Sequence, residues 1–409
     1  LLVLVAVGVC ALLIRALARR ASQPSMGSLL ALVLVVAACW TRASDTWGQR
    51  EHLFVLLALP HVMSRALRVE LRAPAAAVCG VASAVGACIK PHFVALLLVV
   101  EIFAFVRREG RRVDALLVAW CVTGALYALH FFLWPAEMWH AFFELWLPFA
   151  TAAYDAGYGV SMGWVFWRWG TTLLAMSLGV TLGLVIAPRA SLADVSLLAI
   201  ASLSSIGVFL LQGKGFPYHL EPARHLVLLC VAFAVAARWR FAFTHGILAR
   251  GLVSVGSLAV VALFLLVAQA DVRPADAFTV AVEPLSEPGD RVLVLSSLVD
   301  AAYPWAPALD LQVVGHFPCA FPLALSSSGD AEQLEGLNRE ITELVVADLE
   351  EDLALRPELL VVEVAQQCMF CLPERSIVQF LEEAGLAQSV LGQYQAKALV
   401  GDHTVFVRR

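Results

Sequence analysis

Ionisable and aromatic side chains that could act on a phosphorylated substrate gather in three short polar segments, each at the border of a long apolar run. The first segment covers residues 45–52, the second 90–92 and the third 212–222. The chemistry these residue types suggest is binding of a phosphate by cations and transfer of a proton by a carboxylate. The candidate residues are Asp45, Arg50, Glu51, His52, Lys90, His92, Lys214, Tyr218 and His219.

Lysines are rare in this chain, and two of its three, Lys90 and Lys214, lie in these segments. An ammonium group offers a point charge and three donors to phosphoryl oxygens. Beside Lys214, Gly213 and Gly215 would let backbone N–H groups approach the same anion. The alternative interpretation is a solvated loop whose lysine extends to the membrane interface.

The acidic residues of the first segment have two explanations. A carboxylate in the first turn of a helix is stabilised by the helix dipole, which accounts for Glu51 structurally, and Asp45 could be a loop or capping residue. The functional interpretation is that Asp45 or Glu51 acts as a general base or orients an acceptor hydroxyl, with Arg50 and His52 beside it.

The elements that position these residues are predicted to be membrane helices. Hydrophobic residues make up 60% of the chain, charged residues 15%, and the mean hydropathy is +0.80. We therefore expect a polytopic α-helical membrane protein of about nine or ten transmembrane helices with a C-terminal soluble α/β domain. The apolar runs near the required length are 1–15, 25–41, 53–67, 73–89, 92–106, 113–134, 163–187, 191–211, 222–238 and 246–270.

Arginines fall in every second loop, and by the positive-inside rule those loops are cytoplasmic. Residues 73–106 are predicted to form a hairpin of two helices with its tip at 89–92, since one helix of that length would reach about 50 Å. The three candidate segments then share the extracytoplasmic face. The arginines concerned are Arg15, Arg19, Arg20, Arg65, Arg68, Arg72, Arg107, Arg108, Arg111, Arg112, Arg189, Arg238, Arg240 and Arg250.

Two domains are expected, a transmembrane domain over residues 1–270 and an extracytoplasmic α/β domain over 274–409. In the second, strand-like runs at 291–297 and 358–364 flank a helix-like stretch at 330–355, which is typical of a βαβ arrangement. The segments 389–399 and 403–409 are predicted to close the domain as a hairpin around Gly401 and Asp402.

The polar tail contains Cys319, Cys368 and Cys371 among the chain's nine cysteines. Cys368 and Cys371 have redox spacing, but without a second pair they cannot form a four-ligand zinc site. On an oxidising side of the membrane a structural disulfide is expected, with Cys319 as a candidate partner. The sequence assigns no metal ligand and no cofactor, and leaves a requirement for a divalent cation open.

The aromatic stretch 134–169 has two interpretations, an interfacial belt and a platform for sugar binding, and Asp155 within it is not assigned a role.

Three short motifs resemble the GT-C superfamily of polytopic glycosyltransferases, which includes protein mannosyltransferases and aminoarabinose transferases that use polyprenyl-phosphate sugars. They are Gly-Gln-Arg-Glu-His at 48–52, Lys90-Pro91, and the Tyr-His-x-x-Pro element at 218–222, and the resemblance covers about residues 1–270. It implies inverting transfer of a sugar from a lipid phosphate to an extracytoplasmic acceptor that is a lipid, glycan or protein. A carboxylate would deprotonate the acceptor, and Lys214, Lys90 or Arg50 would stabilise the leaving phosphate.

The resemblance also implies partners and location. They are membrane lipids, a polyprenyl-phosphate-linked sugar and an acceptor at a bacterial inner (plasma) membrane; the charge pattern does not suggest nucleic acid. GT-C enzymes usually carry an essential acidic residue in the loop after their first helix. Because residues 1–14 resemble the second helix of such enzymes, the first helix and its loop would lie upstream, and the chain is expected to be an N-terminally truncated fragment. Whether Asp45 or Glu51 takes over that role stays open.

Two other classes of protein compete with this interpretation. A transporter or flippase would carry ionisable residues at mid-depth, whereas the mid-helix positions here are largely Leu, Val and Ala. A membrane-anchored binding protein would act through its tail, where no Gly-rich phosphate loop follows the strand at 291–297 and no nucleophile elbow is present.

Overall fold

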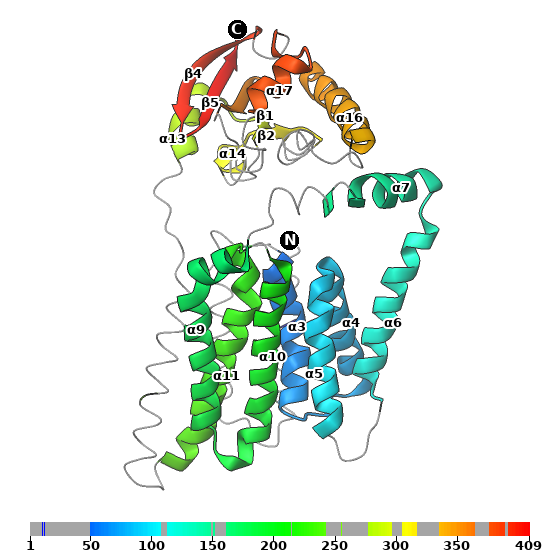
Figure 1. Cartoon of the computed structure of the whole chain (residues 1–409), viewed down its shortest axis with the longest axis vertical. Coiled ribbons are helices and arrows are strands. Elements are labelled where there is room, and N and C mark those ends of the chain that lie inside the picture. The colour runs from blue at the N-terminus through cyan, green and yellow to red at the C-terminus, as the bar shows by residue number, and fades with distance from the viewer. Residues whose placement is uncertain are drawn as a thin grey trace. The chain divides into compact units, whose positions relative to one another are not determined.

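The computed structural model describes two compact units, which we treat separately (Figure 1). The helical unit comprises Leu1–Leu133 and Val160–Val272, and the sheet unit comprises Trp134–Gly159 and Arg273–Arg409. Within them the structure describes residues 10, 12, 50–107, 113–148, 150–151, 161–213, 215–242, 255, 277–296, 305–316, 335–364, 376–388 and 392–409.

The helical unit consists of antiparallel helices joined by short turns. In the part of the chain described, four helical segments are long and apolar enough to cross a membrane, namely Ala115–Leu133, Met162–Ile186, Arg189–Gln212 and Tyr218–Arg238. The elements are α3 (Arg50–Ala66), α4 (Ala73–Ile89), η1 (Pro91–Phe93), α5 (Val94–Arg107), α6 (Ala115–His130), η2 (Phe131–Leu133), α9 (Met162–Ile186), η4 (Arg189–Ser191), α10 (Leu192–Gln212), η5 (Pro217–Leu220) and α11 (Glu221–Ala242).

Every predicted run from 53–67 to 222–238 corresponds to a helix, and α4 ends at Ile89 before α5 begins at Val94, so residues 73–106 form two helices as predicted. The runs 1–15, 25–41 and 246–270 lie outside the described residues, apart from single positions. The structure thus supports a mostly helical protein with four apolar helices that could span a membrane.

Burial differs sharply between these helices. In the most apolar stretch of the span Tyr218–Arg238, 94% of the residues are buried. In the corresponding stretch of Ala115–Leu133, only 6% are buried. Val118, Val122 and Leu126 of α6 are exposed apolar residues on one side of the helix. An apolar face of this size would be unfavourable in water, whereas hydrocarbon solvates it.

Close helix packing around α4 depends on small side chains. A Cβ added to Gly80 would lie 2.3 Å from the backbone oxygen of Leu116 and 3.0 Å from Cβ of Ala119, so only glycine lets α6 approach there. Small residues at helix contacts are typical of membrane bundles, where van der Waals packing drives association.

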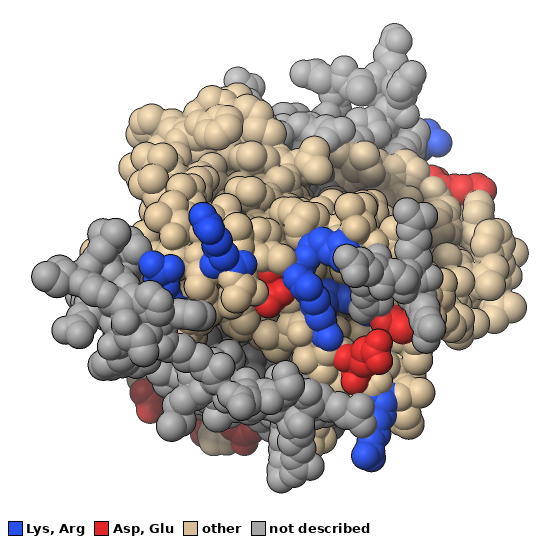
Figure 2. All heavy atoms as spheres, turned by 90° about the horizontal axis from the view of Figure 1, so that it is seen from below, with Lys and Arg blue, Asp and Glu red and all other residues tan. Residues whose placement is uncertain are grey.

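Basic residues lie at the end of the unit where α3 and α5 end and α10 begins. Arg68 and Arg107 approach Asp194 of α10 at 3.4 Å and 3.0 Å. Figure 2 shows this end from below, with side chains of both signs next to one another on a largely uncharged surface. Within the described residues, basic side chains from two of the predicted cytoplasmic loops therefore lie at one physical end of the helical unit.

The sheet unit contains a mixed five-stranded sheet in the order β2-β1-β3-β5-β4. Strand β1 is parallel to β2 and β3, and β5 is antiparallel to β3 and β4. The predicted α/β tail and its closing hairpin are confirmed. The elements are α7 (Ala136–His140), the π-helical turn η3 (Ala141–Trp146), α13 (Ala277–Val282), η6 (Glu283–Leu285), β1 (Arg291–Leu295), α14 (Trp305–Ala308), β2 (Gln312–Val314), α16 (Glu335–Ala354), β3 (Leu359–Glu363), α17 (Ile377–Glu383), β4 (Tyr394–Val400) and β5 (His403–Arg408).

Alternate residues of the central strands enter two separate cores, because successive side chains of a strand point to opposite faces. Leu293 and Leu360 pack with residues of α16 and α17, and Val292 and Val361 pack with residues of α13 and α14. The first core also contains Leu145 of η3, which explains why residues 134–159 group with this unit although they precede it by more than a hundred positions.

Candidate functional site

The structure brings together residues from all three polar segments. They meet at the end of the helical unit opposite Arg68 and Arg107. The Lys90 ammonium donates a hydrogen bond to Oε1 of Glu51, and Nε2 of His219 lies 3.5 Å from the same oxygen. Glu51 is fully buried, and Lys90 and His219 are almost so. We call Glu51, Lys90, Tyr218 and His219 the polar cluster.

Local structure explains why these residues meet. Glu51 lies in the first turn of α3, Lys90 follows the last residue of α4 in an extended conformation, and His219 belongs to η5, which leads into α11. Helix α3 packs against both α4 and α11, and since α4 runs opposite to α3, the end of α4 meets the start of α3. Three segments far apart in sequence therefore converge at one end of the unit.

Aromatic rings surround the ammonium group of Lys90. Its nitrogen lies 5.8 Å from the ring centre of Phe93 and 5.9 Å from that of Tyr218, within the range of cation–π attraction. Phe93 stacks on Phe54 at 4.1 Å, and Tyr218 stacks on Phe216 at 5.4 Å. These rings exclude water from the ion pair, which strengthens its electrostatic interaction.

Among the described residues, only one oxygen of the Glu51 carboxylate has a hydrogen-bond partner. Oxygen Oε1 accepts from Lys90, whereas Oε2 is buried and has no hydrogen-bond partner among the described residues. Buried polar atoms are nearly always hydrogen-bonded, so an open carboxylate oxygen is a position where an incoming hydroxyl can donate. The polar cluster therefore combines an available acceptor oxygen with an adjacent ammonium group.

The loop before η5 is fixed by tryptophans of α9. The carbonyl of Gly215 accepts a hydrogen bond of 2.7 Å from Nε1 of Trp169. At Gly215, φ is +65°, and an added Cβ would lie 2.5 Å from the Trp164 ring. Packing thus accounts for this glycine, while the prediction that its backbone binds an anion stays a prediction.

The structure describes three of the other predicted site residues. Arg50 and His92 are exposed, and His52 is buried within α3. Asp45 and Lys214 lie outside the described residues, so their predicted roles stay predictions.

Two ionisable residues at the start of α11, Arg224 and His225, were not predicted and lie beside Glu221 of the third polar segment. Arg224 donates to Oε1 of Glu221 at 2.9 Å, and Nδ1 of His225 lies 2.7 Å from the backbone oxygen of Glu221. All three side chains are buried. Ionisable residues at i, i+3 and i+4 of an apolar run occupy one face of a helix, and that spacing could have revealed them.

Another polar group, which we call the ion network, joins five buried or partly buried residues from three helices and one helix cap. They are His61 and Arg65 of α3, Ser83 of α4, Glu101 of α5 and Asp114, the N-cap of α6. Nδ1 of His61 lies 2.8 Å from Ser83, and Nε2 lies 2.5 Å from Glu101. Arg65 contacts Glu101 at 2.6 Å and both oxygens of Asp114 at 2.5 Å and 3.0 Å.

The ion network corrects the expectation that the mid-helix positions are apolar. At 1.5 Å per residue His61 lies about 15 Å along α3 from Glu51, roughly half the thickness of a hydrocarbon core. Pro60 precedes it within α3 and removes one backbone hydrogen bond of that helix. The apolar residues around His61 and Glu101 hid them because the runs were read by their average hydropathy.

Among the described residues no group of three or more His, Cys, Asp or Glu side chains could hold a metal ion. Cys319, Cys368 and Cys371, with their predicted disulfide, lie outside that part of the chain, as does Asp155. No family model, curated protein or solved structure matches the chain. The function is therefore argued from the chemistry of the site.

Proposed function

We propose that the chain is a membrane glycosyltransferase that transfers a sugar from a polyprenyl-phosphate donor to an extracytoplasmic acceptor hydroxyl at the polar cluster. The observation that carries this proposal is the fully buried Glu51, with one oxygen bonded to Lys90 and the other open. The short motifs that resemble the GT-C superfamily contain all four residues of the polar cluster and give the proposal its substrate class.

The open oxygen of Glu51 would accept the proton of the acceptor hydroxyl as that oxygen attacks the anomeric carbon of the donor sugar. The new glycosidic bond forms while the bond from the anomeric carbon to the phosphate oxygen breaks, and its electron pair leaves with the polyprenyl phosphate. The configuration at the anomeric carbon inverts, and the proton ends on Glu51.

Lys90 would stabilise the charge that develops on the departing phosphate. An ammonium group carries a full positive charge and N–H donors, both of which phosphoryl oxygens attract. Such a donor is most effective where water is excluded, which is the environment that Phe93 and Tyr218 create. His219 lies close enough to Glu51 to orient its carboxylate.

The location follows from the distribution of charge. Arg65, Arg68 and Arg107 lie at the end of the helical unit opposite the polar cluster, which supports a cytoplasmic position for them and an extracytoplasmic one for the cluster. We infer a bacterial inner (plasma) membrane, because polyprenyl-phosphate sugars serve as donors on its outer face in the family that the motifs resemble. The C-terminal α/β domain would then be extracytoplasmic, on the same side of the membrane as the acceptor.

The test is a transfer assay with the full-length protein in phosphatidylcholine nanodiscs. Radiolabelled polyprenyl-phosphate sugars are offered with extracted envelope material, and labelled product is counted for wild type, Glu51→Gln, Lys90→Met and Lys397→Met. Lys397 is exposed on β4 and provides a matched loss of an ammonium group.

We expect transfer to fall by about 10²- to 10⁴-fold in Glu51→Gln and strongly in Lys90→Met, and to persist in Lys397→Met. Lys90→Arg, which keeps a cation beside Glu51, separates loss of chemistry from loss of fold. A folded wild type that transfers no sugar from any donor would refute the proposal.

The ion network favours a second candidate, a transporter of lipid-linked or small solutes. Its member His61 lies at mid-depth next to Pro60 within α3, and ionisable residues in such positions are typical of transport pathways. Flux of labelled lipid or solute across reconstituted vesicles would then be abolished by Glu101→Gln and unaffected by Glu51→Gln, whereas the transferase proposal predicts no such flux.

A further inference from the structure

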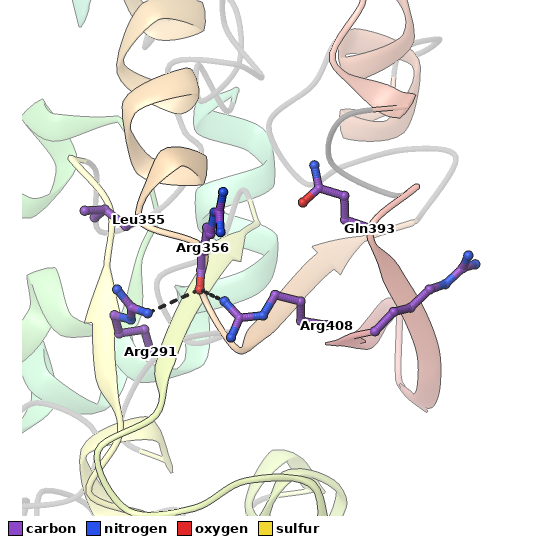
Figure 3. A pocket seen from close by; sticks show the side chains of 6 residues that line it. Arg291, Leu355, Arg356, Gln393 and Arg408 are labelled. Carbon is purple, nitrogen blue, oxygen red and sulfur yellow. Dashed lines mark hydrogen bonds between the residues drawn. The ribbon is translucent and has the colours of Figure 1, made fainter.

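A pocket in the sheet unit is lined mostly by arginines. Its six lining residues are Arg291, Leu355, Arg356, Gln393, Arg408 and Arg409 (Figure 3). They come from the start of β1, the loop before β3, the residue before β4 and the end of β5. These positions share one edge of the sheet because β1, β3 and β4 point the same way. The topology thus collects four cations from three of these segments, and the fourth segment contributes the Gln393 amide.

Two of the four arginines are held in place by a single carboxylate. Oε1 of Glu358 accepts hydrogen bonds of 3.1 Å from both Arg291 and Arg408, and its Oε2 accepts one of 2.9 Å from the backbone N–H of Arg291. The hydrogen bond from the Arg291 side chain, together with the charge of that side chain, lowers the pKa of Glu358 to about 2, so the carboxylate is ionised at neutral pH. Four guanidinium groups around one carboxylate leave an excess of three positive charges. An α-carboxylate on Arg409 would reduce that excess to two.

The backbone of Arg356 turns its carbonyl toward the same two arginines. This oxygen accepts a hydrogen bond of 3.4 Å from Arg291 and another from Arg408, as the dashed lines in Figure 3 show. To do so Arg356 adopts φ of +52°, a left-handed conformation that costs a residue with a side chain roughly 1 kcal/mol. Glycine would adopt it without that cost.

The Arg356 side chain has no role in this arrangement of Glu358, Arg291 and Arg408. Within the described residues nothing accepts a hydrogen bond from its guanidinium group, and the residue is exposed. Figure 3 shows Arg356 and the amide of Gln393 on the same side of the pocket. A strained position therefore carries a cation that the fold does not use.

We propose that this pocket binds a phosphate-bearing group, a phosphomonoester or diphosphate, with Arg356 and Gln393 as donors to its oxygens. A guanidinium group matches phosphate with two parallel N–H donors, and the Gln393 amide adds one more. Arg291 and Arg408, oriented by Glu358, supply positive charge beneath the anion. The phosphate can belong to a lipid headgroup or to a soluble compound, and the inference does not depend on the proposed transferase activity.

The test measures binding of inorganic pyrophosphate to the full chain in phosphatidylcholine nanodiscs by isothermal titration calorimetry at low ionic strength. Arg356→Gly removes the guanidinium group and suits the left-handed backbone, so the domain should stay folded. Arg339→Gln is the matched control, because Arg339 lies on α16 of the same unit with its side chain 81% exposed. Lys90→Met identifies any pyrophosphate bound at the polar cluster.

We expect wild type and Arg339→Gln to bind with equal affinity and Arg356→Gly to bind at least about 10-fold more weakly, since a hydrogen bond to a charged group contributes about 1.5–3 kcal/mol. Thermal unfolding should show Arg356→Gly to be as stable as wild type or more so. Absence of binding by wild type, or equal affinity in Arg356→Gly, would overturn the inference.

A second experiment distinguishes a lipid headgroup from a soluble phosphate as the occupant of the pocket. The titration is repeated in nanodiscs containing phosphatidic acid and in charge-matched discs containing phosphatidylglycerol, whose phosphate is a diester. If a lipid headgroup occupies the pocket, pyrophosphate binds more weakly in phosphatidic acid discs than in phosphatidylglycerol discs. Equal affinity in the two assigns the pocket to a soluble phosphate.

Discussion

Breaking the ion pair of Glu51 and Lys90 should cost more stability than removing both charges together. In Lys90→Met the Glu51 carboxylate, 0% exposed, loses the ammonium that neutralises it; in Glu51→Gln the Lys90 ammonium, 7% exposed, loses its anion. Nε2 of His219, 3.5 Å from Glu51, is a weak replacement for the ammonium. Each single variant thus removes one partner of a buried ion pair.

The expected magnitudes follow from the burial of the pair. Removing one partner of a buried ion pair costs about 3–5 kcal/mol, whereas replacing both by neutral side chains of similar volume is often neutral or stabilising by about 1–4 kcal/mol. Glutamine and methionine keep the volumes of Glu51 and Lys90, so little cavity should form. The coupling free energy between the two changes should therefore be at least about 3 kcal/mol, far above the roughly 0.5 kcal/mol within which independent changes add.

The four proteins of this cycle can be compared by reversible unfolding in mixed detergent micelles, followed by tryptophan fluorescence. Lys397→Met, on the exposed face of β4, should shift the free energy of unfolding by less than about 0.5 kcal/mol. If the changes in the free energy of unfolding of the two single variants simply add in the double variant, the pair is solvated. That result would refute a water-free site. The double variant should be folded but inactive in sugar transfer, which separates stability from chemistry.

Three further predictions concern other parts of the molecule. Gly215→Ala should lower the free energy of unfolding by about 1–3 kcal/mol, since its Cβ would meet the Trp164 ring at 2.5 Å; an unchanged midpoint of thermal unfolding would contradict this. Arg65→Met should cost about 3–5 kcal/mol in the same unfolding assay by leaving the carboxylates of the ion network without their arginine, and a cost below about 1 kcal/mol would mean that the network is hydrated. Glu358, whose pKa is depressed from 4.5 to about 2, should stabilise the sheet unit fully above pH 4.5 and lose that effect as the pH falls toward 2. Hydrogen exchange of β3 should therefore show about 1–2 kcal/mol of acid-induced loss in wild type and less in Glu358→Gln, and equal slopes would refute the assignment.

The sequence predicted elements where one local signal dominated. The turn at Lys90 and Pro91 was predicted correctly because a proline and a cation interrupt an apolar run. The hairpin around Gly401 and Asp402 was predicted correctly because strand-forming residues flank a turn pair. Strand β2 was missed, since its three residues are too few to show a period of two.

The composition of the site was predicted in part, but its pairing was not. Glu51, Lys90 and His219 were selected by residue type and by sidedness along the chain. That Lys90 would bond to Glu51 depends on how α3 packs against α4, which a pattern within one run does not encode. The ion network was missed for the same reason, because His61 and Glu101 each look like one isolated polar residue in an apolar helix until packing brings them together.

The polar cluster and the ion network differ in whether their buried polar atoms have hydrogen-bond partners, and this difference indicates different roles. Among the described residues no side-chain atom of the ion network is buried without a hydrogen-bond partner, whereas Oε2 of Glu51 is. A network whose members satisfy one another can hold helices together, and its position about 15 Å along α3 from Glu51 puts it beyond the reach of a phosphate at the level of the polar cluster. A carboxylate with one open oxygen beside an ammonium group is well suited to receive a proton and an anion. We therefore infer that transfer takes place at the polar cluster, and that the ion network sets the helix spacing on which the cluster depends.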